Sequence, residues 1–368
     1  MLIKKKSIDY NFGMVGNKVL ESVLKQYGIQ NDCLLLPFIN VNGKCIPLNK
    51  RSETSRKTVI SQGNELYILK EIPWYCSNKN FVNYVLNLQK QLFVNGLPVP
   101  EIIETIQGKL YCEIDYEDEV KYVFLQRYIE GNSWNGSEDK LCEAAKMLGK
   151  FHQGIEKSCG QIIAKYNPPK YDVFDIALKM LNTLNEVAID KQSSIREENM
   201  KSLKKFILVY SSKVNEYKKI AYDKGYSNFL IPIHGDYNPW NLIFSKNGSD
   251  IVGIIDFDNS IIDNPVHDLV ESLLDFCLFT YKPQTTRFQG APTSLNKKSA
   301  KIFLENYYNS VPLSYYDMNK YIGEVSFAVT VELISLGIIR GDYDFSEINQ
   351  LMFVIDNIED QISAISTS

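Results

Sequence analysis

The chain has 368 residues, of which 45% are hydrophobic and 23% are charged, so it has the composition of a globular protein and can bury a large core. A chain of this length predicts two lobes or domains rather than one compact core. The formal net charge of −4 excludes the concentrated positive charge that binds nucleic acid or anionic membranes, so we expect neither as a partner.

The sequence also bears on where the protein works. No apolar run reaches the roughly 18 residues needed to cross a bilayer, and the residues after Met1 lack the features of a secretory signal, so we expect a cytoplasmic protein. The 7 cysteines include no Cys-x-x-Cys pair and predict buried or idle thiols. With only 3 histidines, a zinc site built mainly on imidazoles is hard to assemble.

The first third of the chain predicts a small antiparallel sheet with flanking helices. Residues 16–27 place apolar side chains at helical spacing and predict a short leading helix that ends at Gly28. A second helix is expected over residues 80–95. Gln62-Gly63-Asn64 predicts a hairpin turn. Short β runs are expected over residues 46–48, 57–60, 66–72, 109–114 and 121–127.

From Ser137 onward the apolar spacing becomes mostly helical. It predicts helices over residues 138–153, 171–224 (two or three of them) and from 295 to the end. Turn residues between positions 128 and 136 separate the β-rich part from the α-rich part. We therefore expect a first domain over residues 1–131 and a second over residues 132–368.

One segment predicts chemistry. Two apolar strands, residues 231–233 and 242–244, flank a polar loop, and a further strand over 251–255 follows the turn at Asn247-Gly248. The loop reads His-x-Asp-x-x-x-x-Asn, the spacing of the catalytic loop of kinases. The candidate residues are Asp236 as the base that accepts a hydroxyl proton, with Asn241 and Asp256 as metal ligands. The alternative is a polar hairpin whose Asp and Asn side chains only form turns.

This set of residues suits phosphoryl transfer. That reaction asks for little covalent chemistry from the protein, but it needs a metal to neutralise charge and a carboxylate to orient the attacking hydroxyl. Two oxygen ligands from the protein suit Mg²⁺, which keeps water and phosphate oxygens for its other positions.

The motif resembles that of the aminoglycoside phosphotransferase and choline kinase group, whose loop reads His-Gly-Asp-x-x-x-x-Asn. His234-Gly235-Asp236 with Asn241 matches it, as do Ile255-Asp256-Phe257 and the stretch Asp263-Asn-Pro-Val-His-Asp-Leu269. The resemblance implies a protein-kinase-like, two-lobed α+β fold, with a small antiparallel-sheet lobe and a larger, mainly helical lobe. It also implies Mg²⁺, ATP or GTP as phosphate donor, and a small-molecule hydroxyl as acceptor: an aminoglycoside, a sugar, an amino alcohol or a homoserine-like compound.

The resemblance further assigns roles in the two lobes. Residues 1–131 would bind the nucleotide, and residues 132–368 would carry catalysis and the acceptor. Lys70 is placed like the lysine that contacts the α- and β-phosphates. Three hydroxyl residues of a glycine-free loop would cover the phosphates: Ser52, Thr54 and Ser55. The hinge that contacts adenine would consist of Gln126, Arg127 and Tyr128.

The helix over 80–95 departs from the kinase pattern because it contains no Glu to pair with Lys70, and Asn83 or Asn87 occupies the expected position. This detail resembles the spore coat branch of the group (CotS type). A catalytically silent, kinase-fold structural protein such as a spore coat protein therefore stands as the alternative. A protein kinase is disfavoured because no Ala-Pro-Glu stretch or activation segment follows Asp256.

Several points stay open at the level of sequence. Asp258 could join the metal shell or only a turn. Glu271 and Asp275 could face a cationic substrate, although a solvated acidic face is the simpler interpretation. The three histidines, His152, His234 and His267, all fit structural roles: a satisfied core residue, a buttress of the catalytic loop, and part of a helix start where Asp268 would cap N–H groups.

Overall fold

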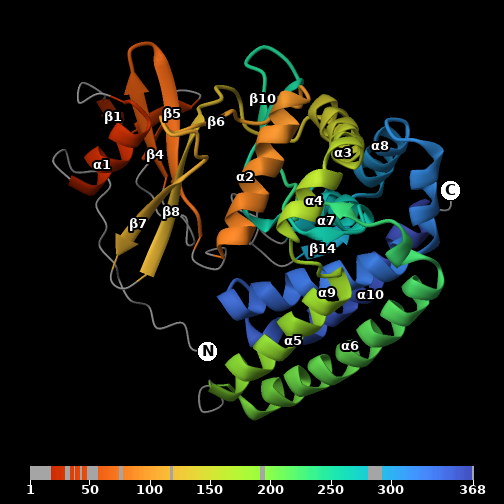
Figure 1. Ribbon diagram of the computed structural model, residues 1–368. Helices are drawn as coiled ribbons and strands as arrows, with labels where there is room; N and C mark the ends of the chain where they lie inside the picture. The colour runs from red at the N-terminus through yellow and green to blue at the C-terminus, as the bar shows by residue number, and fades with distance from the viewer. Residues whose placement is uncertain are drawn as a thin grey trace. The chain divides into compact units, whose positions relative to one another are not determined.

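The computed structural model describes residues 18–29, 34–36, 38–41, 44–47, 57–73, 78–116, 119–190, 195–280 and 292–366. Its contacts divide the chain into two compact units (Figure 1). Unit 1 consists of Met1–Asn132 with Gln161–Asn167, and unit 2 of Ser133–Gly160 with Pro168–Ser368. The assignment of nucleotide binding to residues 1–131 and of catalysis to residues 132–368 stays a prediction.

Unit 1 is built on an antiparallel sheet, as predicted. Among the described residues six strands pair in the order β1-β4-β5-β8-β6, with β7 also paired to β8, and β2 and β3 form a separate hairpin. The predicted turn at Gly63 joins β4 to β5. The strands are β1 (Leu34–Leu36), β2 (Phe38–Val41), β3 (Lys44–Pro47), β4 (Lys57–Gln62), β5 (Glu65–Glu71), β6 (Ile102–Ile103), β7 (Cys112–Tyr116) and β8 (Glu119–Arg127).

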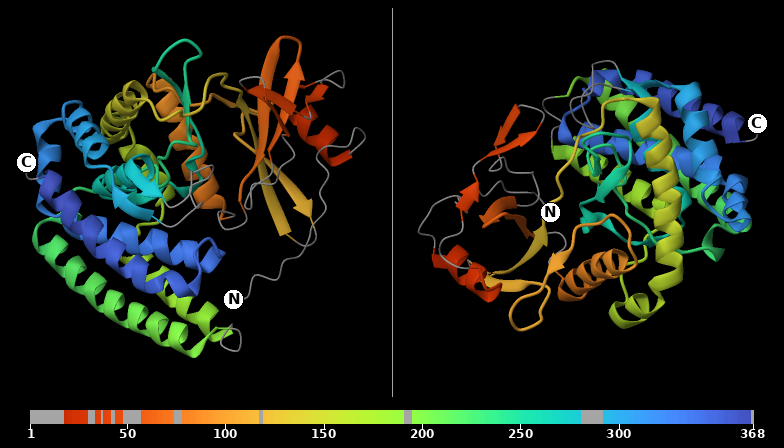
Figure 2. Two further views of the ribbon diagram at one scale, coloured as in Figure 1. Left: turned by 180° about the vertical axis from the view of Figure 1, so that it is seen from behind. Right: turned by 90° about the horizontal axis from the view of Figure 1, so that it is seen from above.

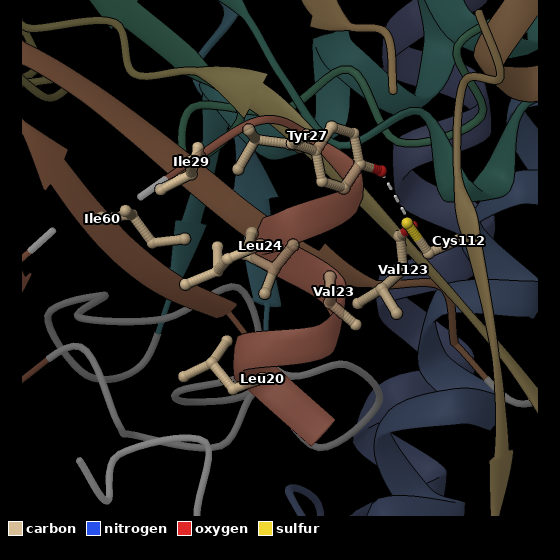
Figure 3. Packing of buried hydrophobic residues seen from close by; sticks show 10 residues of the cluster. Leu20, Val23, Leu24, Tyr27, Ile29, Ile60, Cys112 and Val123 are labelled. Atoms are coloured by element: carbon tan, nitrogen blue, oxygen red, sulfur yellow. Dashed lines mark hydrogen bonds between the residues drawn. The ribbon is translucent and has the colours of Figure 1, made fainter. Parts of the chain in front are cut away.

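The two faces of this sheet bury different helices, because successive side chains of a strand point to opposite faces. On one face, Leu69, Val123 and Leu125 pack in a core with α1 (Lys18–Gln26). Figure 3 shows the apolar side chains of α1 directed at the strands, and the Tyr27 hydroxyl donates to the Val123 carbonyl at 3.3 Å. Both predicted helices of the first third are confirmed, since α2 (Lys79–Val94) packs on the other face.

Lys70 belongs to the face that carries α2. It lies directly opposite Phe124 in the β5–β8 register, and Phe124 packs with Val82 and Leu86 of α2. The Lys70 side chain is 3% exposed, and its Nζ lies 5.9 Å from the centroid of the Phe124 ring. The sheet therefore holds this ammonium group on a buried surface.

Unit 2 is mainly helical, and Figure 2 shows α5, α6, α9 and α10 side by side. The helices predicted from residue 138 onward are confirmed, and the stretch 171–224 holds two of them. The helices are α3 (Glu138–Ser158), α5 (Val173–Asp190), α6 (Glu197–Asp223), α7 (Val266–Cys277), α8 (Lys297–Tyr308), α9 (Ile322–Arg340) and α10 (Ile348–Ser366). Of α4 (Gly160–Tyr166), only Gly160 belongs to unit 2.

Short strands and 3₁₀ turns complete unit 2. Among the described residues three two-stranded antiparallel sheets form from β9 (Ile231–Pro232) with β12 (Ile262–Asp263), β10 (Leu242–Phe244) with β11 (Ile251–Ile254), and β13 (Leu278–Thr280) with β14 (Pro292–Leu295). The 3₁₀ segments are η3 (Tyr226–Asn228), η4 (Phe257–Asn259), η5 (Leu313–Lys320) and η6 (Phe345–Glu347). Segment η3 links α6 to β9 and η4 links β11 to β12, whereas η5 and η6 link α8 to α9 and α9 to α10.

Helix α9 lies at the centre of the helical core. It packs against α5, α6, α7 and α10, and most of its residues are apolar. By length and composition alone it could cross a membrane, although Glu324 and Glu332 interrupt its apolar run. Because 67% of its most apolar 18-residue stretch is buried inside the protein, a core helix accounts for its composition.

Candidate active site

A β-hairpin brings the two candidate metal ligands together. In β10 and β11, Leu242 pairs with Ile254, and the Ile255 N–H donates to the Asn241 carbonyl at 3.0 Å, which extends the ladder by one pair. Asn241 therefore lies opposite Ile255, and Asp256 follows directly. The Asn241 side chain is buried and Asp256 is half-buried. Apolar strands thus fix two oxygen-bearing side chains at one end of a hairpin.

The candidate base Asp236 lies against the same asparagine. The Asn241 amide nitrogen, Nδ2, donates to the Asp236 backbone carbonyl and to its carboxylate Oδ2, both at 2.9 Å. This contact turns the Asn241 amide oxygen away from Asp236. An amide oxygen and a carboxylate are the hard oxygen donors that Mg²⁺ prefers, so the residues present fit this metal. The structure thus brings Asp236, Asn241 and Asp256 together, as their spacing predicts.

Asp256 has an uncommon backbone conformation. Its φ of 74° and ψ of 63° lie in the left-handed region, which costs a residue other than glycine about 1–2 kcal/mol. The following Phe257 begins η4 and packs 4.8 Å from the ring of His234 and 6.1 Å from that of Phe151. Strain held in place by buried aromatic packing is typical of functional residues.

Asp268 of α7 anchors the start of the catalytic loop. Its carboxylate accepts the N–H of His234 at 2.6 Å and that of Gly235 at 2.7 Å, and the ring of His152 lies 3.2 Å from the same carboxylate. Burial would raise the pKa of Asp268, but the hydrogen bond and charge of His152 and the His234 N–H lower it. The sequence interpretation of Asp268 as a helix cap was wrong, because its oxygens bind a loop 33 and 34 residues away.

The three histidines have the structural roles that the sequence predicts. Nδ1 of His152 lies 2.8 Å from the Tyr307 hydroxyl, and its ring is fully buried. Nε2 of His234 donates to the Ile255 carbonyl at 3.1 Å, and burial lowers the pKa of this histidine. A neutral His234 therefore joins the catalytic loop to the strand that ends at Asp256.

Gly235 is required by the loop geometry. Its φ is +70°, and a Cβ atom at this position would lie 2.3 Å from the carbonyl oxygen of Asn259 in η4. Every other residue has that Cβ atom, so only glycine allows the catalytic loop and η4 to approach this closely. The glycine of the His-Gly-Asp motif is therefore explained by a backbone contact between two functional segments.

His267 gives unit 2 a pH-dependent contribution to stability. Burial disfavours the charged imidazolium, but the hydrogen bond and charge of Asp263, 2.9 Å away, together with the charges of Glu271 and Glu332, raise the pKa of His267 to about 9. This lies above the value of about 6.5 in an unfolded chain. A charged His267 therefore contributes its full stabilisation just below pH 6.5, and this contribution is lost as the pH rises through 9. At low pH the pair is lost as well, because burial raises the pKa of Asp263 and favours its protonated form.

We expect His267→Gln to lower the free energy of unfolding by up to about 3 kcal/mol at pH 6, with a smaller difference from the wild type at pH 9.5. Denaturant titrations of both proteins at several pH values measure this difference. A difference that is constant from pH 6 to pH 9.5 would show that the pair with Asp263 does not depend on a charged His267.

The structure describes only some of the residues that are predicted to bind the nucleotide in unit 1. Gln126 is buried, and its side-chain oxygen accepts from the amide of Gln89 at 3.2 Å. The N–H groups of Arg127 and Tyr128 donate to the carbonyls of Glu101 and Leu66, both at 2.9 Å, so these two donors already belong to the fold of unit 1. The loop residues lie outside the described residues: Ser52, Thr54 and Ser55.

Helix α2 carries no carboxylate, in agreement with its sequence. The amide nitrogen of Asn83 donates to the Lys79 carbonyl at 2.8 Å and to the Tyr111 hydroxyl at 3.4 Å. That of Asn87 donates to the Asn83 carbonyl at 2.7 Å. Both amides therefore bind groups of α2 itself or of the neighbouring sheet.

The acidic residues of α7 do not form a solvated face. Glu271 is 6% exposed and Asp275 is half-buried, because α7 packs between α8 and α9. The prediction of an exposed acidic face was therefore wrong for Glu271. Asp258, in η4, is also buried. The spacing of charged residues along α7 does not by itself predict that nearly the whole helix is buried by its neighbours.

Comparison with protein families gives one match to this chain. The model described as "Phosphotransferase enzyme family" matches residues 77–280, which is more than half of the chain and includes the candidate base and both candidate metal ligands. The comparison with curated proteins finds no match.

Solved structures share the fold at low sequence identity. An amicoumacin kinase in complex with AMP-PNP, Ca²⁺ and Ami is 14% identical, with a TM-score of 0.60 over 84% of this chain and 89% of that one. Choline kinase from Cryptosporidium parvum Iowa II is 12% identical, with a TM-score of 0.57 over 91% of each chain. A microcompartment-associated aminopropanol kinase is 13% identical, with a TM-score of 0.56 over 95% of this chain and 96% of that one. These similarities confirm the kinase-like α+β fold.

Proposed function

Because this chain belongs to the phosphotransferase enzyme family, it is a small-molecule kinase, and we propose that it moves the γ-phosphate of ATP or GTP onto a hydroxyl group of its acceptor. The observation that carries this proposal is the placement of Asp236, Asn241 and Asp256 at one end of the β10–β11 hairpin. A carboxylate beside two oxygen ligands is the arrangement that phosphoryl transfer to an alcohol needs.

We assign a role to each residue of this set. Asp236 orients the acceptor hydroxyl and accepts its proton, and Asn241 and Asp256 hold Mg²⁺ through their side-chain oxygens. The bound cation would supply charge neutralisation for the phosphate oxygens. Asp268 and Gly235 hold the loop in the shape that presents Asp236.

In unit 1 the proposal extends to the nucleotide. The ammonium group of Lys70 supplies a positive charge for the inner phosphates. The hydroxyl-rich loop of Ser52, Thr54 and Ser55 would cover those phosphates. The segment from Gln126 to Tyr128 would contact the purine ring of the nucleotide. It would do so through groups other than the two N–H donors that already bind Glu101 and Leu66. These assignments rest on resemblance to the family.

For the acceptor, we propose a small molecule that carries both a hydroxyl and an amino group. Support comes from the names of proteins with a similar fold, which include an aminopropanol kinase and a choline kinase. An aminoglycoside or a homoserine-like compound also carries both groups, and a sugar, which offers hydroxyl groups alone, is the remaining candidate. We propose that the protein works in the cytoplasm, with neither nucleic acid nor membrane as a partner.

The first test is calorimetric titration of ATP and of GTP, with and without Mg²⁺, into the wild type and Asp256→Ala. We expect Mg²⁺-dependent binding to the wild type, and at least tenfold weaker binding to the variant because one metal ligand is lost. Asp250→Ala is the matched control, since Asp250 is an exposed carboxylate beside the start of β11. Absence of nucleotide binding to the wild type would favour the catalytically silent alternative, which the lack of a carboxylate on α2 also suggests.

A further inference from the structure

Asn238, two residues after Asp236, uses both ends of its side-chain amide. Its Nδ2 donates to Asp236 Oδ1 at 2.7 Å. Its Oδ1 accepts the backbone N–H of Trp240 at 2.9 Å and that of Asn241 at 3.2 Å. The opposite orientation of the amide would place oxygen against carboxylate and NH₂ against two N–H groups, so these neighbours fix it. The side chain is 3% exposed, and its contacts lie within the catalytic loop.

The contact between Asn238 and Asp236 means that each oxygen of the Asp236 carboxylate accepts from one side-chain amide. Asn238 binds Oδ1 of Asp236, and Asn241 binds Oδ2 at 2.9 Å. With one amide N–H on each oxygen, the carboxylate cannot rotate freely. Asn241 is also a proposed metal ligand, so its orientation depends on the cation. Asn238 has no such second role.

We propose that Asn238 is a positioning residue that holds the Asp236 carboxylate in the orientation that meets the acceptor hydroxyl. This inference rests on the proposed function, in which Asp236 is the base. The competing explanation is local: Asn238 would only close the turn, through the bonds from Trp240 and Asn241 to its oxygen. The two explanations make opposite predictions for one nearly isosteric substitution.

Asn238→Asp separates them because Asp keeps the turn-closing oxygen but loses the N–H donor and places a second negative charge beside Asp236. Asn238→Ala loses both functions. If Asn238 positions Asp236, both variants lose at least about tenfold in kcat for Mg²⁺-dependent phosphate release from ATP with water as acceptor, while KM for ATP changes by less than about threefold.

A role in turn closure alone would instead give an Asp variant with wild-type kcat and KM for ATP, and this result would overturn the inference. Asn78 offers the matched control. Its side-chain oxygen accepts two backbone N–H groups, from Asn80 at 2.9 Å and Phe81 at 3.4 Å, at the start of α2. Asn78→Asp should leave the rate within about twofold, which shows that the exchange itself is tolerated in such a turn.

Failure of the proposed function is distinguishable from failure of this inference. In the first case the wild type itself binds no nucleotide and releases no phosphate, whereas in the second the wild type is active and Asn238→Asp matches it.

Discussion

Asp236→Asn is expected to lower kcat by about 10²- to 10⁴-fold, the range that a positioned general base contributes. The substitution keeps the shape of the side chain but removes the group that accepts the hydroxyl proton. In the wild type the amides of Asn238 and Asn241 each donate to one carboxylate oxygen of Asp236. The variant places its own amide against these two donors. The rate of Mg²⁺-dependent phosphate release from ATP, with water or a screened alcohol as acceptor, measures this loss.

The affinity for ATP separates this effect from damage to the metal site. Asp236→Asn should bind ATP within about threefold of the wild type, because Asn241 and Asp256 are unchanged. Asp250→Asn, an exposed aspartate of the same hairpin, should retain wild-type turnover. If Asp236→Asn kept more than about a third of the wild-type kcat, Asp236 would not be the base.

Gly235→Ala should destabilise the protein strongly, although it adds a single methyl group. The left-handed backbone costs about 1–2 kcal/mol for a residue with a Cβ atom, and overpacking against the Asn259 carbonyl adds about 1–3 kcal/mol. We therefore expect the free energy of unfolding to fall by roughly 2–5 kcal/mol. Denaturant titration measures the change, and turnover should fall as well, because the loop and η4 must separate.

Gly341→Ala is the matched control for Gly235→Ala. Gly341 ends α9 with a φ of +83°, but a Cβ atom there meets nothing within 4 Å. This variant should lose only about 1–2 kcal/mol, the cost of the backbone conformation. Equal losses in the two variants would mean that the loop relaxes around the added methyl group, so that the contact with Asn259 imposes no requirement for glycine.

Local sequence patterns were sufficient to predict the elements that carry the site. The spacing of five between Asp236 and Asn241, and the apolar strand that ends at Asp256, each depend on a short stretch of chain. A hairpin then brings them together by its own geometry. The leading helix, α2 and the strands around Gly63 were predictable for the same reason, since apolar periodicity and turn residues act over a few positions.

The contacts that shape the site could not be predicted in this way. Asp268 has the position of an ordinary helix-capping residue, and only the tertiary fold shows that it accepts N–H groups from His234 and Gly235. Asn238 is equally unremarkable in sequence, because its two roles depend on how the loop turns. Glu271 was misjudged since burial of α7 depends on α8 and α9, which follow later in the chain.

The anchoring of the catalytic loop by Asp268 also has a consequence for how the enzyme can vary. Asp268 lies on α7, its partner His152 on α3, and the Tyr307 that contacts His152 on α8. Three helices from distant parts of the sequence thus set the position of a loop that has little regular structure of its own. A substitution that shifts these helices without unfolding them is expected to lower turnover before it lowers stability. The residues tolerated in this helical core are then restricted by the need for catalysis before they are restricted by the need to fold.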